Sequence, residues 1–390
     1  VIIGAGPAAI NAIETIRELD GGRSSITLVC DEPAHARMAL PYWLAGSIPE
    51  AQTHTGDAAY FARLGVTTRF GVRVASIDPP GRIVALSDGG TLAFDDLLIA
   101  TGSSPVRPTI EGADLPGVET LWTLADTARV LQRADALQAA GRMPRVVLVG
   151  AGFVGFIVLN AMHKRQWHLA VVEREAHVLP RMLDAAAADH VQRWLATCGI
   201  PIHCGTTVRR IRQQDDGAKS VELSDGRTLA ADIVILATGV RANLDLVKGS
   251  GIATDDGILV NDRLQTNFPH VYAGGDVAQG PVLFGAGLAV HPIQPTAVDH
   301  GRVVGANMAG HDVRYPGSLS MNVVDVCGLQ GASFGRWNDA AGEATTIDNP
   351  SGFIHRRFVF TGDRITGAVF EILRNARVLK PPEHLRLVLK

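Results

Sequence analysis

The chain has 390 residues, a length that predicts two or three domains. Its 36 Lys and Arg against 39 Asp and Glu leave a formal net charge of −3, which excludes the strongly basic surface of a nucleic-acid-binding protein or of a lipid-binding segment. Hydrophobic residues make up 46% and charged residues 19%, as in folded rather than disordered chains. The 42 glycines have no G-x-y period, so we expect tight turns or close approaches to a ligand instead of collagen.

The cysteines and the apolar runs predict the cellular compartment of the protein. The four cysteines are scattered and form no C-x-x-C pair, so they predict reduced thiols rather than a disulfide framework or a zinc site. No apolar run reaches the ~18 residues of a membrane span, and nothing at Val1 suggests a signal peptide. We therefore expect a cytoplasmic protein without a membrane segment.

The first predicted unit lies at the start of the chain. An apolar strand at 1–3 leads into Gly4-Ala5-Gly6-Pro7-Ala8-Ala9, and apolar residues then recur at helical spacing up to residue 20. In such a strand–turn–helix the first glycine permits the turn, and the second lets a phosphate approach the backbone at the helix N-terminus. The next strand, 26–29, leads to Asp31, at the distance where an acidic side chain holds a ribose hydroxyl.

A second unit of the same kind begins near residue 146. The strand 146–149 precedes Gly150-Ala151-Gly152-Phe153-Val154-Gly155 and a helical pattern that extends to about residue 166. The following strand, 169–172, ends at Glu173. A carboxylate there accepts from a 2′-hydroxyl and repels a 2′-phosphate, which favours NADH over NADPH.

Two such units predict two dinucleotide-binding domains. The fold class is therefore α/β, with two Rossmann-like three-layer domains. After Gly310, runs at 323–326 and 353–360 predict antiparallel strands, so we add a small α+β domain. The predicted division is a discontinuous first domain (1–108 and 244–312), a second domain (109–243) and a C-terminal domain (313–390), with a linker at 103–108.

Further stretches connect the chain to a known family. A strand ends in Ala100-Thr101-Gly102, a second in Ala237-Thr238-Gly239, and Thr266–Ala278 contains Ala273-Gly274-Gly275-Asp276. With the two glycine motifs, this order resembles the pyridine nucleotide–disulfide oxidoreductase superfamily. The resemblance is greatest to the branch of NADH oxidases, rubredoxin and ferredoxin reductases and the flavin part of nitrite reductase.

The resemblance implies FAD at the first glycine motif and NAD(P)H at the second. Asp31 would hold the adenosine ribose, Val74 the adenine through its backbone, and Asp276 the ribityl–pyrophosphate part. The predicted FAD residues are Gly4, Gly6, Pro7, Ala8, Ala9, Asp31, Glu32, Arg37, Val74, Ala100, Thr101, Gly102, Gly275, Asp276, Gln294 and Pro295. The predicted NAD residues are Gly150, Gly152, Phe153, Val154, Gly155, Glu173 and Gly239.

Two positions depart from the family's pattern. Met38 stands where many relatives have a redox cysteine, in Arg37-Met38-Ala39-Leu40-Pro41-Tyr42. Because a thioether forms no thiolate, disulfide reduction is disfavoured. Ile157 stands where the family usually has a glutamate near the nicotinamide, so positioning of the nicotinamide is expected to be looser.

We predict that hydride passes from NADH to the flavin and that the electrons go to an iron–sulfur or rubredoxin-type carrier. Two alternatives remain open: a reductase of a small molecule, such as oxygen (giving peroxide) or a quinone, and a flavin-binding subunit or sensor whose NAD site has decayed. The resemblance also implies a homodimer. No metal site is expected, and we interpret His291 and His300, which flank the predicted flavin helix, as structural.

Overall fold

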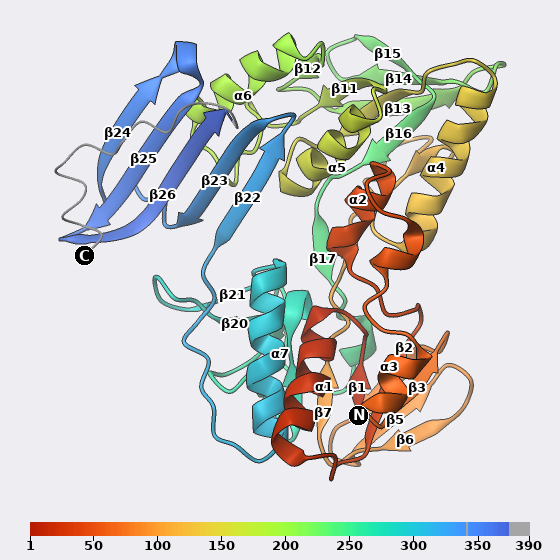
Figure 1. Ribbon diagram of the computed structural model, residues 1–390, viewed down its shortest axis with the longest axis vertical. Helices are drawn as coiled ribbons and strands as arrows, with labels where there is room; N and C mark the ends of the chain where they lie inside the picture. The colour runs from red at the N-terminus through yellow and green to blue at the C-terminus, as the bar shows by residue number, and fades with distance from the viewer. Residues whose placement is uncertain (341, 374–390) are drawn as a thin grey trace.

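The computed structural model describes residues 1–340 and 342–373 (Figure 1). Two units built on parallel sheets lie one above the other in Figure 1, and an antiparallel sheet stands beside the upper one. The predicted α/β class with two Rossmann-like units is therefore confirmed.

The lower unit is built from two separate stretches of the chain, one before and one after the upper unit. Its five-stranded parallel sheet has the order β19-β7-β1-β2-β3, with β19 at Val271–Ala273, β7 at Leu97–Ile99, β1 at Ile2–Ile3, β2 at Ile26–Cys30 and β3 at Val66–Phe70. The helices α1 (Pro7–Asp20) and α7 (Gln294–Met308) lie side by side on this sheet. Pro at the first helical position and a left-handed Gly21 just after the last turn explain the bounds of α1.

Smaller elements complete the lower unit. The antiparallel sheet is formed by β4 (Val74–Asp78), β5 (Ile83–Leu86) and β6 (Thr91–Ala93). The short helix α3 spans Ala58–Arg63, and a further small sheet contains β18 (Ile258–Leu259), β20 (Ala278–Pro281) and β21 (Leu288–Ala289). The short helix α2 (Leu40–Leu44) comes from the same stretch of chain but packs against α4 (Leu124–Ala139) and α5 (Phe153–Lys164) of the upper unit.

The upper unit repeats this plan. Its parallel sheet has the order β12-β11-β10-β16-β9, with β12 at Ile202–His203, β11 at His168–Val172, β10 at Arg145–Val149, β16 at Ile233–Leu236 and β9 at Val118–Glu119. The Val-rich centre of β10 is fully buried, as expected for a strand covered on both faces. The other elements are α4 (Leu124–Ala139), α5 (Phe153–Lys164), α6 (Ala185–Thr197), β13 (Val208–Gln213), β14 (Lys219–Leu223) and β15 (Thr228–Ala231).

The two crossings between the units lie next to each other. Ser103–Pro105 forms β8, which pairs antiparallel with β17 (Val240–Ala242). The predicted linker at 103–108 therefore contains a strand, because each crossing supplies the backbone hydrogen-bond partner that the other needs. The predicted boundaries at 108 and 243 fall within a few residues of this ribbon; together with the one at 312 they remain predictions.

The antiparallel sheet near the C-terminus has the order β22-β23-β26-β25-β24. Its strands are β22 (Met321–Val326), β23 (Leu329–Gly335), β24 (Glu343–Asn349), β25 (Ile354–Thr361) and β26 (Arg364–Leu373). The strands predicted at 323–326 and 353–360 correspond to β22 and β25. Because β22 packs against α5, this sheet is attached to the upper unit and reaches toward the space between the two units.

Two glycines determine how closely α7 approaches α1. A Cβ atom at Gly301 would lie 2.3 Å from the carbonyl oxygen of Ala8, and one at Gly305 would lie 2.7 Å from that of Ala12. The two helices therefore pack backbone against backbone, which fixes the relative position of their N-termini.

Gly301→Ala is expected to destabilise the protein by about 1–3 kcal/mol, because the added methyl forces the helices apart. Helix propensity alone would make the same change stabilising by about 1 kcal/mol, so the two effects have opposite signs. Urea denaturation measures the difference, and an increased free energy of unfolding would contradict the close packing of α1 and α7.

A partly buried cluster of histidines and carboxyl groups joins α6 to the C-terminal sheet. The ring of His355 is 1% exposed, with Nδ1 2.9 Å from Asp348 Oδ1 and Nε2 3.0 Å from Asp184 Oδ2. Nearby, His190 Nδ1 lies 2.9 Å from Glu371 Oε2. Burial by itself lowers the pKa of His355, but the two carboxylates outweigh it and the pKa is raised above 6.5.

A His355→Gln variant tests the sign of this contribution. Because the pKa of His355 is higher in the folded protein, its stabilisation is complete below pH 6.5 and is lost as the pH rises through the folded pKa. The wild type should therefore lose its advantage in unfolding free energy over the variant as denaturation is repeated from about pH 6 upward. If the difference in unfolding free energy between the wild type and the variant instead increased with pH, the imidazole would not be held in its charged form.

Candidate dinucleotide site

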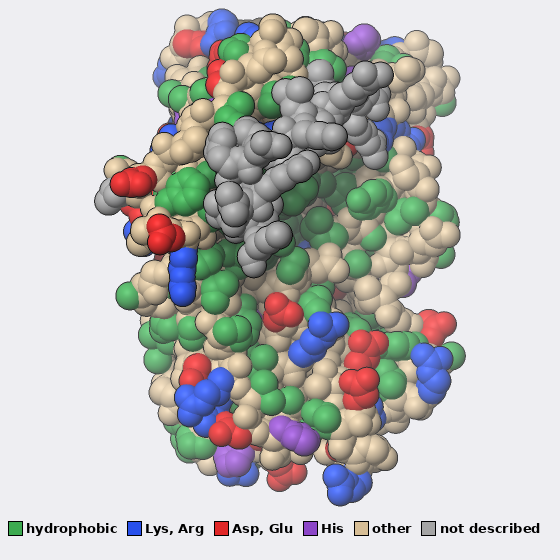
Figure 2. Space-filling model, turned by 60° about the vertical axis from the view of Figure 1, so that its left-hand side comes forward, with side chains coloured by type: hydrophobic (Ala, Val, Ile, Leu, Met, Phe, Trp, Pro, Cys, Tyr) green, Lys and Arg blue, Asp and Glu red, His purple; other side chains and the backbone are tan. Residues whose placement is uncertain are grey.

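A cavity of about 1040 Å³ lies between the two units and is lined by both of them and by β22. Hydrophobic side chains gather across the middle of the face shown in Figure 2, between the upper and lower halves of the molecule. Most of its charged side chains come from the lower unit, with Asp126 of α4 added by the upper unit, whereas α2, α5 and β22 contribute mostly apolar side chains.

The first glycine of each motif is required by the protein's own backbone. Gly4 has a φ of +97°, and a Cβ atom there would lie 2.2 Å from the carbonyl oxygen of Ala100. Gly150 has a φ of +105°, and its Cβ would lie 2.3 Å from the carbonyl oxygen of Ala237. In each unit the glycine turn therefore packs against the residue that follows the neighbouring strand, which is β7 in the lower unit and β16 in the upper unit.

The second glycine of each motif is not required by the protein. Gly6 and Gly152 have φ values of −78° and −83°, which any residue can adopt, and a Cβ at either would meet nothing within 4 Å. Each is the N-cap of its helix, and neither helix has a side-chain cap. The free N–H groups and the open space beside them fit a phosphate at both positions.

The predicted FAD residues are brought together by the lower unit. Every one of them except Ala9 lines the cavity. Ala9 is fully buried in α1 and faces the core, so it contributes to packing and does not line the cavity.

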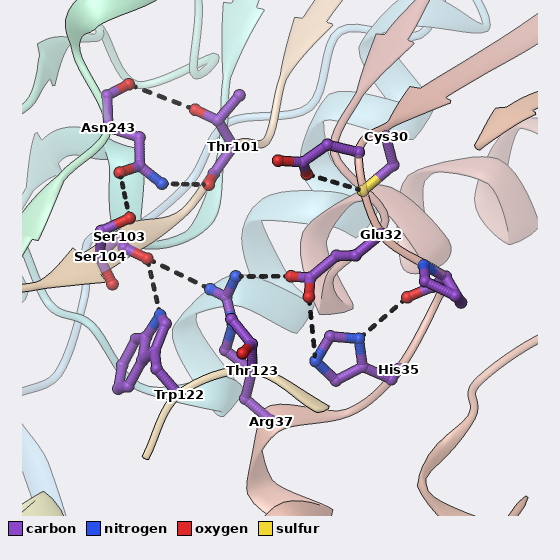
Figure 3. A network of polar contacts seen from close by, with 12 residues as sticks. Cys30, Glu32, His35, Arg37, Thr101, Ser103, Ser104, Trp122, Thr123 and Asn243 are labelled. Atoms are coloured by element: carbon purple, nitrogen blue, oxygen red, sulfur yellow. Dashed lines mark hydrogen bonds and ion pairs between the residues drawn. The ribbon is translucent and has the colours of Figure 1, made fainter. Parts of the chain in front are cut away.

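A polar network links several of these residues (Figure 3). The carbonyl oxygen of Ser103 accepts from Arg37 Nη1 at 3.3 Å and from Trp122 Nε1 at 2.8 Å. The guanidinium of Arg37 also lies over the Trp122 ring, 5.2 Å from its centroid, and contacts Glu32 at 3.2 Å. Since Trp122 belongs to the upper unit, the network joins both units at the edge of the cavity.

Asp276 extends this network and is half-buried. The hydroxyl of Ser103 donates to Asp276 Oδ2 at 2.7 Å. Burial raises the pKa of the Asp276 carboxyl, and the hydrogen bond from Ser103 offsets only part of that effect. A half-buried carboxyl beside a cavity favours a hydroxyl-bearing ligand that donates to it.

Two further groups surround the end of β2. Asp31 forms an ion pair with Arg73 at 2.7 Å. His35 is buried, its Nδ1 lies 2.9 Å from the carbonyl oxygen of Pro33, and its Nε2 has no hydrogen-bond partner among the described residues. His35 Nε2 faces the Glu32 carboxylate at 4.0 Å, and Asp31, Glu32, His35 and Arg73 all line the cavity, where a ligand can contact them.

The predicted NAD residues divide into two groups. Phe153 and Val154 line the cavity, whereas Gly150, Gly152, Gly155, Glu173 and Gly239 lie outside it. The carboxylate of Glu173 is buried and accepts from the backbone N–H groups of Ala151 at 2.6 Å and Glu175 at 2.8 Å. It therefore fixes the glycine turn, and its role toward a ribose stays a prediction.

The apolar end of the cavity contains Met38, whose side chain is 42% exposed, together with Phe153, Ile157 and Val323. Of the four cysteines, Cys30 lines the cavity, at its polar end beside Asp31. Burial raises the pKa of the Cys30 thiol, so it is held in the protonated form. Among the described residues, no group of three or more His, Cys, Asp or Glu has the geometry of a metal site.

Sequence reasoning missed several residues of the site. Trp122, Asn243 and Asn322 line the cavity but belong to none of the motifs. Asn243 donates to the carbonyl oxygen of Thr101 at 2.8 Å and accepts from Ser104 at 2.7 Å. For Trp122, the Thr123–Asp126 capping box at the start of α4 is the one local signal, because it fixes the preceding residue.

Comparison with known proteins identifies the class. Residues 1–296 match the pyridine nucleotide-disulphide oxidoreductase family, and the chain belongs to that family. It is 29% identical to the NADH-dependent phenylglyoxylate dehydrogenase subunit epsilon of Aromatoleum evansii, over 95% of this chain and 87% of that protein. It is 30% identical to the rhodocoxin reductase of Rhodococcus erythropolis, over 81% of this chain and 73% of that protein.

A solved structure supports the same class. The NAD-dependent persulfide reductase from A. fulgidus superposes with a TM-score of 0.88 at 26% identity, covering 100% of this chain and 76% of that one. The family and its members indicate FAD and NADH as cofactors, and the uncapped helix N-termini fit their phosphates. The chain is an NAD(P)H-dependent flavoprotein oxidoreductase. None of its described helices is long and apolar enough to cross a membrane.

Proposed function

We propose that the protein carries electrons from NADH through FAD to a one-electron iron–sulfur or rubredoxin-type carrier. The observation that carries the proposal is the shared cavity: the polar loops of the first glycine unit and the first turn of α5, from the second unit, line the same space. A flavin held by the lower unit and a nicotinamide held by the upper unit can therefore meet.

The residues of the chain would bind and orient the two cofactors. FAD would lie against Gly4–Ala8, Asp31–Arg37, Val74, Ala100–Gly102, Gly275–Asp276 and the N-terminus of α7 at Gln294–Pro295. NADH would bind with its pyrophosphate at the N-terminus of α5, beside Gly152. The N-terminus of α7 would favour negative charge on the flavin's nearest edge.

The apolar end of the cavity supports a reaction without a protein thiol. Phe153, Val154 and Ile157 would pack against the nicotinamide and exclude water from it. Bound FAD supplies the chemistry, since a flavin accepts a hydride and can release the two electrons one at a time. Met38 cannot supply a thiolate for a disulfide substrate.

The acceptor class rests on the relatives. The name of the rhodocoxin reductase gives rhodocoxin as its substrate, a further relative is named as the ferredoxin–NAD(+) reductase component of a biphenyl dioxygenase system, and the phenylglyoxylate dehydrogenase protein is named as a subunit. The second candidate is a small-molecule acceptor, which is favoured by the persulfide reductase and by the exposed, apolar end of the cavity.

A panel of acceptors distinguishes these candidates. The protein is reduced with NADH without oxygen and mixed with a rubredoxin, a [2Fe–2S] ferredoxin, a quinone or oxygenated buffer, with NADPH as a parallel donor. Faster reoxidation by an iron-containing protein, and faster reduction by NADH, are expected. Turnover as fast with air or quinone as with any protein carrier would favour the second candidate.

We also propose a homodimer in the cytoplasm. Sedimentation of the purified protein tests the assembly, and a monomer at micromolar concentration would contradict it.

A further inference from the structure

His300 is a buried side chain on α7 that none of the cofactor motifs includes. It is 2% exposed, and its Nδ1 lies 3.2 Å from the backbone nitrogen of Gly275, in a buried hydrogen bond. A backbone N–H can only donate, so Nδ1 must be the unprotonated, accepting nitrogen and Nε2 carries the proton.

The surroundings of the ring keep it neutral. Burial, with a smaller effect from His291, lowers the pKa of His300 to about 4. The ring meets Tyr315 edge to face, with the centroids 4.7 Å apart. Its Nε2 has no hydrogen-bond partner among the described residues, so the bond to Gly275 is the polar contact that this side chain makes.

Gly275 lines the cavity at a position where the backbone is tightly constrained. It has a left-handed φ of +76° and is enclosed by Ala8 of α1 and Ala297 of α7. The next residue, Asp276, accepts a hydrogen bond from the buried Ser103 hydroxyl at 2.7 Å. The conformation of this turn therefore decides where the Asp276 carboxyl stands.

We propose that His300 is a positioning residue for FAD: its neutral imidazole holds the Gly274–Gly275–Asp276 turn so that Asp276 faces the flavin cofactor. Six residues earlier on the same helix, Gln294 begins α7 at the cavity. The helix α7 thus contributes its N-terminus to the FAD cavity and, through His300, also fixes the Gly274–Gly275–Asp276 turn. The inference rests on the proposed function in taking FAD as the ligand of this cavity.

Two variants separate the hydrogen bond from the packing. In His300→Asn, the side-chain oxygen can accept from Gly275 at nearly the position of Nδ1, whereas His300→Leu fills similar space without an acceptor. Tyr315→Phe is a matched control that keeps the ring against His300 and removes only the hydroxyl, which donates to Ser318.

The measurement is the dissociation constant of FAD, by titration of each apoprotein, alongside the thermal midpoint and the amide hydrogen exchange of Gly275. We expect the leucine variant to bind FAD about 10- to 100-fold more weakly, from the loss of a bond to a buried donor, with faster exchange at Gly275. The asparagine and Tyr315→Phe variants should stay within about threefold of the wild type, well under the 1.4 kcal/mol that a tenfold change represents.

Different failures have different meanings. A leucine variant that binds FAD as tightly as the wild type, or an asparagine variant as weak as the leucine one, overturns the role of His300 and leaves the proposed function standing. A wild-type apoprotein that takes up no FAD overturns the proposed function as well.

Discussion

Gly152→Ala is expected to weaken NADH binding by about 10- to 100-fold while the protein stays folded and keeps its FAD. The backbone at this N-cap tolerates alanine, because its φ is −83° and the added Cβ meets no protein atom within 4 Å. The methyl would occupy the space through which the pyrophosphate reaches the N–H groups of α5. Losing one hydrogen bond to a charged group costs about 1.5–3 kcal/mol.

The dependence of the flavin reduction rate on NADH concentration measures this effect, with the thermal midpoint recorded beside it. Gly150→Ala is the matched comparison. It should lower the stability as well as the NADH affinity, because its Cβ would lie 2.3 Å from the Ala237 carbonyl oxygen. If Gly152→Ala responded to NADH like the wild type, the second glycine motif would not be the site of the pyrophosphate.

Gly6→Ala is expected to have the corresponding effect on FAD. The backbone there has a φ of −78° and a Cβ would again meet nothing, so the apoprotein should fold normally. The methyl would obstruct the FAD pyrophosphate at the N-terminus of α1, and we expect a loss of about 10- to 100-fold in FAD affinity. FAD content after purification and titration of the apoprotein measure it.

The comparison for this change is Gly4→Ala, whose Cβ would lie 2.2 Å from the Ala100 carbonyl oxygen and should disturb folding itself. Normal FAD content in Gly6→Ala would remove the reason for placing the flavin cofactor at the first motif. Loss of FAD with no change in the thermal midpoint of the apoprotein is the outcome that we expect.

The glycine turns were predictable because they are local. A strand, a turn with a left-handed first glycine and a helix occupy fewer than about twenty consecutive residues, so Gly4 and Gly150 could be assigned from the spacing alone. The strands at β2, β10 and β16 were predictable for the same reason, as short Val- and Ile-rich runs between turns.

The contacts between distant segments were not predictable. Trp122 reaches Ser103 only because the two units fold against each other, and His300 meets Gly275 only because α7 lies on α1. Nothing in the sequence near Ser103 indicates that it pairs with Val240–Ala242 across more than a hundred residues. Ala9 fits the spacing of the motif, but its side chain faces the core.

Anaerobic mixing of the FAD-loaded protein with NADH in a stopped-flow instrument tests the central claim most directly. If the two glycine units deliver their cofactors to one cavity, the visible absorbance of the flavin should disappear in a single turnover, with a rate that saturates at NADH concentrations up to about a millimolar. Protein that retains FAD and shows no loss of flavin absorbance at millimolar NADH would contradict it, and would leave a flavin-binding subunit with an inactive second site.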